Sequence, residues 1–303
     1  MSIHSSIIVN DASIIDFAYI DKQGKLKGNS INYSFAISGD TTPNEKVIVD
    51  FSTVKKAIKY HLDLSYEDNK MNGFDHKLWI IQGFSTCQVI KGKDKYMIQT
   101  PVLSLELPFD AVKLVPIIDL SNKVEIESML TRDLQYKIAS TIENNHNIQL
   151  KSFVNFDFKS IFTQPLVGFS YVHGLKDSTS YGCQNIAHGH YSYLQLLSND
   201  NNEIVCTLRK QIAIALNDKI LINKANIIDD TANTLTLAYT TKRGLFKLEL
   251  NKQENKYILF DSETTIEFIA QYIKDSYGEE LKEAGVYAFV VSEGLSKGAY
   301  LDL

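Results

Sequence analysis

The chain of 303 residues has little cysteine, no block of basic residues and no long apolar run. Its three cysteines, Cys87, Cys183 and Cys206, are odd in number and lack C-x-x-C spacing, which favours free thiols in a reducing compartment. A formal net charge of -5 excludes the basic footprint of a nucleic-acid or anionic-membrane binder. No apolar run approaches the roughly 18 residues of a bilayer span, and the first residues lack a signal-peptide pattern. We therefore expect a soluble, cytoplasmic protein that acts on small molecules.

Two halves of the chain show the same order of expected elements, which indicates an internal repeat. Each half has two alternating strands, an amphipathic helix, a short apolar run, a longer helix and a closing strand. The expected elements lie near 15–21, 32–40, 54–62, 115–119, 124–144 and 150–158 in the first half, and near 168–173, 192–200, 208–216, 257–261, 264–277 and 286–292 in the second.

This order predicts an α+β fold with two tandem domains, each an antiparallel sheet that carries two helices on one face. The periodicity is interrupted near 160–165, where Pro165 follows polar residues. We therefore expect an N-terminal domain over 1–160 and a C-terminal domain over 161–303.

His188-Gly189-His190 is the most informative motif of the chain. Alternate residues of a strand face the same side, so the two imidazoles point to one ligand. His173 ends another strand-like segment, and a paired strand could bring it to the same place. Three histidines with an open fourth position are typical of a catalytic zinc site. Cys183, between the ligands in sequence, then becomes a candidate nucleophile or base, although a small buried structural cysteine is the alternative.

The halves differ in these functional residues. In the alignment that sets Tyr33 over Tyr193, no histidine of the motif has a histidine opposite it: the pairs are His173 with Asp21, His188 with Gly28 and His190 with Ser30. The first half carries Asp75-His76 after its first helix, where the second half has no histidine. An adjacent Asp-His pair is a candidate general acid or base, because histidine titrates near neutrality; bracing a loop is the alternative.

These motifs resemble the 6-pyruvoyltetrahydropterin synthase and 6-carboxytetrahydropterin synthase family, whose domains have the tunnelling fold (T-fold). Only the His-Gly-His with its cysteine and the Asp-His-Lys are specific to that family, while Tyr191 stands where the family usually has asparagine. The matching residues are His173, Cys183 and His188-Gly189-His190, then Asp50-Phe51 and Asp75-His76-Lys77, then Glu263-Thr264-Thr265-Ile266-Glu267 and Glu293. Family members hold all of these in one unit of about half this length, so the chain resembles two such units fused.

The resemblance implies roles for these residues. His173, His188 and His190 would bind Zn²⁺, and Cys183 would take a proton from the substrate with Asp75 and His76 completing the catalytic set. The Glu293 carboxylate would pair with the amino and N–H groups of a pterin. Thr264 and Thr265 would contact the substrate, or serve only as the N-cap of the following helix.

The resemblance further implies a zinc-dependent lyase that acts on 7,8-dihydroneopterin triphosphate. Of the two activities, it favours the 6-carboxytetrahydropterin type, which serves queuosine and other deazapurine synthesis. We expect a homo-oligomer, a dimer or a trimer, because open sheet edges must be paired or covered. A catalytically silent homologue that binds metal or pterin as a ligand-binding or scaffold protein is the alternative. The two differ in whether Asp75-His76 approaches Cys183.

Overall fold

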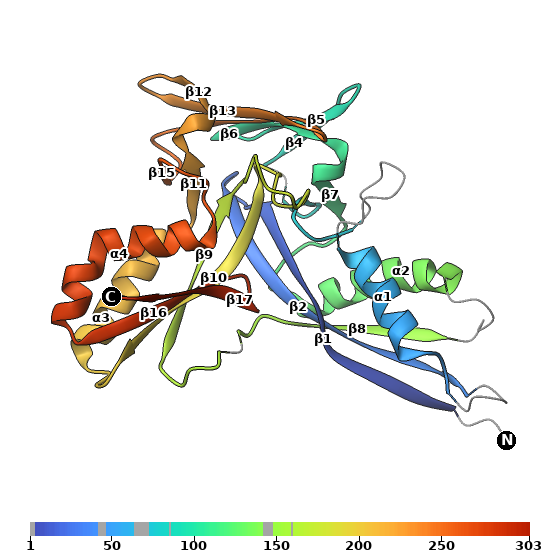
Figure 1. Ribbon diagram of the computed structural model, residues 1–303. Helices are drawn as coiled ribbons and strands as arrows, with labels where there is room; N and C mark the ends of the chain where they lie inside the picture. The colour runs from blue at the N-terminus through green and yellow to red at the C-terminus, as the bar shows by residue number, and fades with distance from the viewer. Residues whose placement is uncertain (1–3, 42–46, 64–72, 85, 142–147, 159) are drawn as a thin grey trace.

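The computed structural model describes residues 4–41, 47–63, 73–84, 86–141, 148–158 and 160–303. The first part of the chain forms a five-stranded sheet with two helices on one face (Figure 1). Its strands, in the order β7-β3-β1-β2-β8, are β7 (Val112–Val115), β3 (Lys77–Ile81), β1 (His4–Ile20), β2 (Leu26–Asp40) and β8 (Gln149–Asn155). The helices are α1 (Phe51–Leu62) and α2 (Lys123–Thr141).

The second part repeats this arrangement and adds one strand at the edge. Its sheet has the order β15-β11-β9-β10-β16-β17, with β15 (Tyr257–Phe260), β11 (Lys219–Asn223), β9 (Leu166–His173), β10 (His188–Ser198), β16 (Val286–Glu293) and β17 (Lys297–Asp302). The helices α3 (Glu203–Leu216) and α4 (Ile266–Glu283) cover one face. We call the two parts the first and the second unit.

A third sheet joins the two units, and we call it the bridging sheet (Figure 1). Each unit contributes three strands to it between its inner strands and its second helix. Its central pair is β6 with β14, one strand from each unit. Its strands, in the order β12-β13-β14-β6-β5-β4, are β12 (Ile227–Asp230), β13 (Thr234–Thr241), β14 (Gly244–Asn251), β6 (Leu103–Pro108), β5 (Lys95–Gln99) and β4 (Gln88–Lys91). Short 3₁₀ turns follow β6 at Phe109–Ala111 and precede β12 at Lys224–Asn226.

The predicted fold class is confirmed: the protein is α+β, with two tandem units that each pack two helices on one face of a sheet. The centre of each sheet is antiparallel, whereas β3 and β7, like β11 and β15, join in parallel. The bridging sheet was not predicted, because its short strands lack a long periodic pattern. The helices at 54–62 and 208–216 begin earlier than predicted, at Phe51 and Glu203. The last residues of the helix expected at 124–144 lie outside the described residues.

Alternation along β1 and β9 divides the interior into three cores. Ile15 and Phe17 face α1 and α2, and Phe169 and Tyr171 face α3 and α4. Residues between them, such as Ala18 and Val172, face the bridging sheet and form a central core with both units. The strands β1 and β2 also contact β9 and β10 directly. Within the described ranges, no helix combines the length and apolar character that a membrane span requires.

The register of the strands relates the two units residue by residue. In the first unit Asp16 pairs with Ser30, and its carbonyl accepts the backbone N–H of His76. In the second, Ser170 pairs with Tyr191, and its carbonyl accepts the N–H of Asp218. Asp16 is therefore equivalent to Ser170, Ser30 to Tyr191 and His76 to Asp218. By the same register, the counterparts of His173, His188 and His190 are Tyr19, Lys27 and Asn29.

The sequence alignment of Tyr33 with Tyr193 was thus wrong by one residue, and so were its counterparts Asp21, Gly28 and Ser30. Tyr33 belongs to the helix-side core, whereas Tyr193 lies outside that core and stacks on Phe158. The true equivalent of Tyr33 is Leu194, which does pack under the helices. A slip of one residue transfers a side chain to the opposite face of a strand. The conclusion drawn from the alignment still holds, since the first unit has no histidine at the three positions.

Candidate active site

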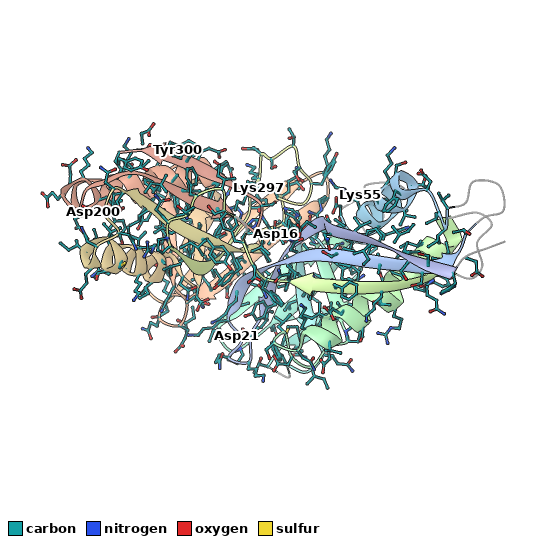
Figure 2. All side chains as sticks on the ribbon, turned by 90° about the horizontal axis from the view of Figure 1, so that it is seen from below. Asp16, Asp21, Lys55, Asp200, Lys297 and Tyr300 are labelled. Carbon is teal, nitrogen blue, oxygen red and sulfur yellow. The ribbon has the colours of Figure 1, made fainter. Side chains whose placement is uncertain are left out.

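His173, His188 and His190 come together on the helix side of β9 and β10. His173 and His188 lie opposite each other in the antiparallel pair, and His190 follows on the same face. Each histidine is at most 1% exposed, and one ring nitrogen of each lies within 4.8 Å of the others. The strand pairing inferred from the sequence therefore gathers the three imidazoles as predicted. They lie at the junction between the two units, where His190 contacts Asp16 of β1; Figure 2 labels Asp16 near Lys297.

The hydrogen bonds of His173 and His188 leave one nitrogen of each ring for a ligand. Nδ1 of His173 is 2.8 Å from the Thr264 carbonyl, and Nδ1 of His188 is 2.9 Å from the Asn185 carbonyl. A carbonyl accepts only from N–H, so Nδ1 carries the proton and Nε2 keeps its lone pair. Both Nε2 atoms are buried and have no hydrogen-bond partner among the described residues. Unpaired buried nitrogens that converge in this way fit a metal ion.

The protonation state of these rings agrees with a metal site. Burial, reinforced by the nearby His190, lowers the pKa of His173 to about 3. Burial and the neighbouring histidines lower the pKa of His188 well below its ordinary value. Both rings are therefore neutral at physiological pH, which is the form that binds a metal. A donor set of three imidazoles fits Zn²⁺.

His190 makes its contacts with carboxylates from both units. Its Nδ1 is 3.3 Å from Oδ1 of Asp16 in β1, and its Nε2 is 3.8 Å from Oε1 of Glu293 at the end of β16. Although burial favours the neutral acid, the charge and hydrogen bonding of His190 lower the pKa of Asp16 to about 2. Asp16 is thus ionised beside the histidines despite its burial.

The Asp75-His76 pair of the first unit meets Cys183 of the second unit within one chain. Oδ1 of Asp75 accepts the Asp16 backbone N–H at 2.7 Å, and Oδ2 lies 2.5 Å from Nδ1 of His76. His76, Cys183 and His188 each place a nitrogen or sulfur within 4.8 Å of the other two. The His76 and His188 rings are 5.2 Å apart. The predicted catalytic residues and the predicted metal ligands therefore share one site.

Electrostatics in this site favours a thiolate next to a protonated imidazole. Burial lowers the pKa of His76, but the charge and hydrogen bond of Asp75 outweigh it and raise the pKa well above its ordinary value. Burial raises the pKa of Cys183, but the hydrogen bond and charge of His76 outweigh that effect and lower it. A thiolate paired with an imidazolium is a reactive form of cysteine at neutral pH.

Glu293, predicted to bind the substrate, lies next to the histidines and to Lys297. Its Oε2 is 2.8 Å from the Lys297 Nζ, and its side chain is 12% exposed. Burial raises the pKa of Glu293, but His190 and Lys297 outweigh it, so the net shift is downward. The carboxylate is thus ionised and reaches the edge of the candidate metal site.

Thr264 and Thr265 lie behind the site. Thr264 is fully buried, and both its carbonyl and its Oγ1 contact Nδ1 of His173, the latter at 3.1 Å. These contacts orient the His173 ring. Thr265 is the N-cap residue of α4, although its side chain makes no capping hydrogen bond.

Two buried polar residues at the site were missed from the sequence, Asp16 and Asn185. The Asn185 side-chain amide donates to the His76 and Ala111 carbonyls, both at 3.0 Å, while the backbone carbonyl of Asn185 accepts from His188. Asn185 therefore ties the Asp-His pair to a candidate metal ligand. Its position two residues after Cys183 was a signal, whereas Asp16 in an alternating strand gave none.

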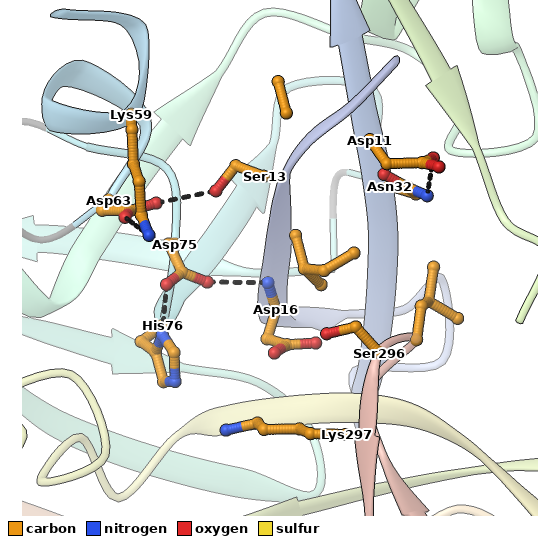
Figure 3. Close-up of a pocket in the computed structure, with 13 residues that line it drawn as sticks. Asp11, Ser13, Asp16, Asn32, Lys59, Asp63, Asp75, His76, Ser296 and Lys297 are labelled. Carbon is orange, nitrogen blue, oxygen red and sulfur yellow. Dashed lines mark hydrogen bonds and ion pairs between the residues drawn. The ribbon is translucent and has the colours of Figure 1, made fainter. Parts of the chain in front are cut away.

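A pocket of about 490 Å³ opens beside these residues, between β1, the end of α1 and the turn that follows β16 (Figure 3). Asp75, His76 and Asp16 line one side, and Lys297 lies across from them. Asp63 and Lys59 of the first unit extend the lining away from His76. The pocket is large enough for a small heterocycle and is lined by both units, which gives a ligand access to the His76 side of the site.

No protein-family model matches the chain, and no curated protein matches it in sequence. Among solved structures, it is similar to a catalytic-residue mutant of 6-pyruvoyltetrahydropterin synthase from Plasmodium vivax, with 16% identity and a TM-score of 0.37 over 51% of this chain and 92% of that one. The 6-pyruvoyltetrahydropterin synthase of Plasmodium falciparum gives 17% and 0.34 over 51% and 98%. An uncharacterized protein of Wolinella succinogenes gives 12% and 0.31 over 46% and 95%. At such identities and TM-scores, no residue role transfers from these proteins to this chain.

Proposed function

We propose that the protein is a zinc-dependent lyase that acts on a reduced pterin, 7,8-dihydroneopterin triphosphate, as a synthase of the 6-carboxytetrahydropterin or 6-pyruvoyltetrahydropterin type. One observation carries the proposal: within a single chain, three buried imidazoles with unpaired nitrogens adjoin the Cys183, His76 and Asp75 side chains. His173, His188 and His190 would hold the ion. When bound, Zn²⁺ would polarise and acidify the side-chain hydroxyls of the substrate.

Cys183, His76 and Asp75 move protons in this proposal. The lowered pKa of Cys183 makes its thiolate a base that accepts a proton from the substrate side chain. His76 donates its own proton to the developing product on the same side of the site, and the proton taken up by Cys183 then restores the protonated His76. Asp75 keeps His76 protonated and fixes its ring through Nδ1. The three side chains thus divide the roles of base, acid and orienting group.

The pocket beside His76 is the proposed entry for the pterin. Its walls carry carboxylates and the Lys297 ammonium, which can accept from and donate to the polar edges of a heterocycle. Glu293 contacts Lys297 and is ionised, so its carboxylate would accept N–H groups of the pterin once Lys297 moves aside. Thr264 acts through His173 in this proposal, and Thr265 begins α4.

The approach of His76 to Cys183 favours an enzyme over a protein that only binds metal or pterin. A binding protein requires neither a cysteine with a lowered pKa nor an Asp-His pair beside it. Perturbed acids and bases that cluster beside a pocket are typical of catalytic sites.

The proposal is tested by metal analysis and by turnover of 7,8-dihydroneopterin triphosphate with wild type, Cys183→Ala and His76→Ala. We expect one zinc per chain in all three and a loss of activity of about 100-fold or more in both variants, as for removal of an acid or base. Cys206→Ala is the matched control, because Cys206 lies on α3 and contacts Arg209. Activity indifferent to both site substitutions would refute the mechanism. Release of triphosphate alone would indicate carbon–oxygen cleavage, and a two-carbon fragment would indicate carbon–carbon cleavage in the deazapurine direction.

We also propose a homo-oligomer, a dimer or a trimer. The outer edge of β8 is covered, because α2 side chains take its backbone N–H groups: Gln135 that of Leu150, Thr131 that of Ser152 and Glu127 that of Val154. The edge strand β17 of the other sheet alternates between exposed and half-buried residues and is the better candidate for pairing. Light scattering in solution gives the size, and a monomer would refute this proposal.

A further inference from the structure

We propose that Asp16 is a positioning residue of the metal centre, supplied by the first unit to fix the His190 ring of the second unit. The inference rests on the proposed zinc site, and it adds to that site a residue outside the histidine motif. It makes the metal centre, and not only the proton-transfer groups, depend on both units. The candidate ligand is a divalent transition metal held by imidazole nitrogens.

The three histidines differ in what holds Nδ1. The rings of His173 and His188 are held by carbonyls of their own unit, at 2.8 and 2.9 Å. Among the described residues, Nδ1 of His190 has no hydrogen-bonded carbonyl. It lies instead 3.3 Å from Oδ1 of Asp16, at ion-pair distance. Asp16 thus occupies for His190 the place that carbonyls occupy for the other two ligands.

Both units hold the Asp16 carboxylate in place. The Ser30 hydroxyl donates to Oδ1, and the Ser30 oxygen accepts the backbone N–H of Tyr191 at 2.9 Å. The turn after β16 closes the other side, since a Cβ on Gly294 would lie 2.5 Å from Asp16 Oδ1. Gly294 also has a φ of 65°, which glycine adopts without strain. With only 4% exposure, Asp16 has little freedom to turn away from His190.

The chemistry of the contact gives it a consequence for metal binding. A carboxylate that accepts from Nδ1–H makes the imidazole a stronger donor at Nε2 and fixes the plane of the ring. Nε2 of His190 has no hydrogen-bond partner in the described structure. Replacing the carboxylate by an amide of the same shape is therefore expected to lower the affinity for the metal without removing a metal ligand. The equivalent of Asp16 in the second unit is Ser170, which bonds to Asp218 instead.

The test is a competition titration of Zn²⁺ against a chromophoric chelator, with the full chain as wild type, Asp16→Asn, His190→Ala and the double variant. We expect Asp16→Asn to weaken zinc about 10- to 100-fold, the usual range for loss of an outer partner. In the His190→Ala background the same substitution is expected to change affinity by less than about 2-fold, because its effect passes through that ring. Asp11→Asn, on the same strand and away from the histidines, is the matched control and is expected to leave zinc affinity unchanged.

The outcomes separate this inference from the proposed function. Wild type without stoichiometric zinc overturns the proposed metal site and the inference with it. Zinc-loaded wild type with an unaltered Asp16→Asn affinity overturns only the inference, and so do equal losses in both His190 backgrounds. If Asp16→Asn fails to fold, Ser30→Ala decides. That substitution frees the carboxylate and is expected to weaken zinc several-fold, and an unchanged affinity refutes the positioning role.

Discussion

The two units present the same backbone at two places, and the proposed metal site lies at one of them. At the metal end, His173, His188 and His190 of the second unit face Asp75-His76 of the first. At the opposite place, which we call the ion-pair end, the equivalent residues of the first unit are Tyr19, Lys27 and Asn29. Of these, Lys27 contacts Asp218 of the second unit. Lys27 Nζ lies 2.9 Å from Asp218 Oδ2 and 3.7 Å from Asp21.

The difference lies in which groups are left without a protein partner. Lys27 and Asp218 neutralise each other, so the ion-pair end is complete without a ligand. The histidines leave buried Nε2 atoms unpaired, and burial of such atoms is costly unless something binds them. The same strand pairing therefore supports either a closed ion pair or a candidate metal site. The side chains at three positions decide between them.

The largest expected effect is on stability, and it comes from substitutions at the contact between the two units. Gly28 and Gly189 are equivalent residues in contact, since a Cβ on Gly189 would lie 2.5 Å from the Gly28 Cα. A Cβ on Gly28 would overlap the Tyr171 carbonyl, which is backbone and cannot turn aside. We expect Gly28→Ala and Gly189→Ala each to lower the free energy of unfolding by about 3 kcal/mol or more. Chemical denaturation measures this.

Gly278→Ala is the matched control for this prediction. A Cβ there meets only ordinary contacts at 3.6 and 4.0 Å, and the position lies within α4. It is expected to be neutral or to stabilise the helix by up to about 1 kcal/mol. Equal stability of the three variants would show that the units do not meet at the two glycines.

The comparison predicts one metal per chain, bound at the metal end only. His188→Ala removes a ligand and is expected to weaken zinc by more than about 100-fold, beyond the range for an outer partner. Lys27→Ala changes the equivalent position of the first unit and is expected to leave zinc affinity unaltered. Calorimetric titration gives both affinity and stoichiometry. Two zinc ions per wild-type chain, or a loss of zinc in Lys27→Ala, would contradict the assignment of the two ends.

Much of the metal end followed from local sequence pattern. His188 and His190 alternate in one strand and His173 ends the next, so their convergence needed only the pairing of two neighbouring strands. The contact between His76 and Cys183 was harder to predict from the sequence, because it depends on how one unit packs on the other. It was suggested by the resemblance and by the separation of the two motifs between the halves.

The parts that could not be predicted depend on register and on non-local contacts. Tyr33 and Tyr193 are the same residue type but lie on opposite faces of their sheets. Only the strand pairing reveals that the sequence alignment was offset by one residue. In the sequence, Asp16 resembles any polar residue of a half-buried strand. Its role becomes visible only in the structure, where it contacts Ser30 and His190. The bridging sheet closes through β6 and β14, which lie more than a hundred residues apart. Sequence patterns indicate the periodicity of an element and its buried face. They do not give the distances between elements on which these features depend.

A smaller effect tests the helix ends that flank the two sites. Asp63 is the C-cap residue of α1 and lines the pocket, whereas the C-cap residue of α3 is Asn217. Burial, followed by the charge of Asp75, raises the pKa of Asp63 from 3.8 to about 6. Folding therefore disfavours its carboxylate. This destabilisation is absent well below the ordinary pKa of 3.8, grows as pH rises from there to about 6 and is complete above it.

Asp63→Asn gives α1 the cap residue of α3 and removes this carboxylate. Since the side chain is about one third exposed, we expect a gain in unfolding free energy of roughly 1–2 kcal/mol at pH 7.5. The gain is expected to shrink as pH falls through 6 and to vanish at about pH 3, where the wild-type carboxyl is protonated in both states. Denaturation at several pH values measures it. A gain that is independent of pH would assign the effect to the cap geometry.

The smallest expected effect concerns the ion pair that stands in place of the metal. Lys27 and Asp218 are 27% and 31% exposed, so solvent screens their attraction and the pair contributes about 1 kcal/mol. Lys27→Met leaves Asp218 facing Asp21 without the ammonium between them, and Asp218→Asn leaves Lys27 with Asp21 alone. We expect the double variant to be less destabilised than the sum of the two single variants by about 1 kcal/mol, measured by denaturation at low ionic strength. High salt should reduce this coupling. Strict additivity of the two substitutions would mean that packing alone holds the units together at the ion-pair end. The Lys27–Asp218 pair would then contribute nothing to the contact between the units.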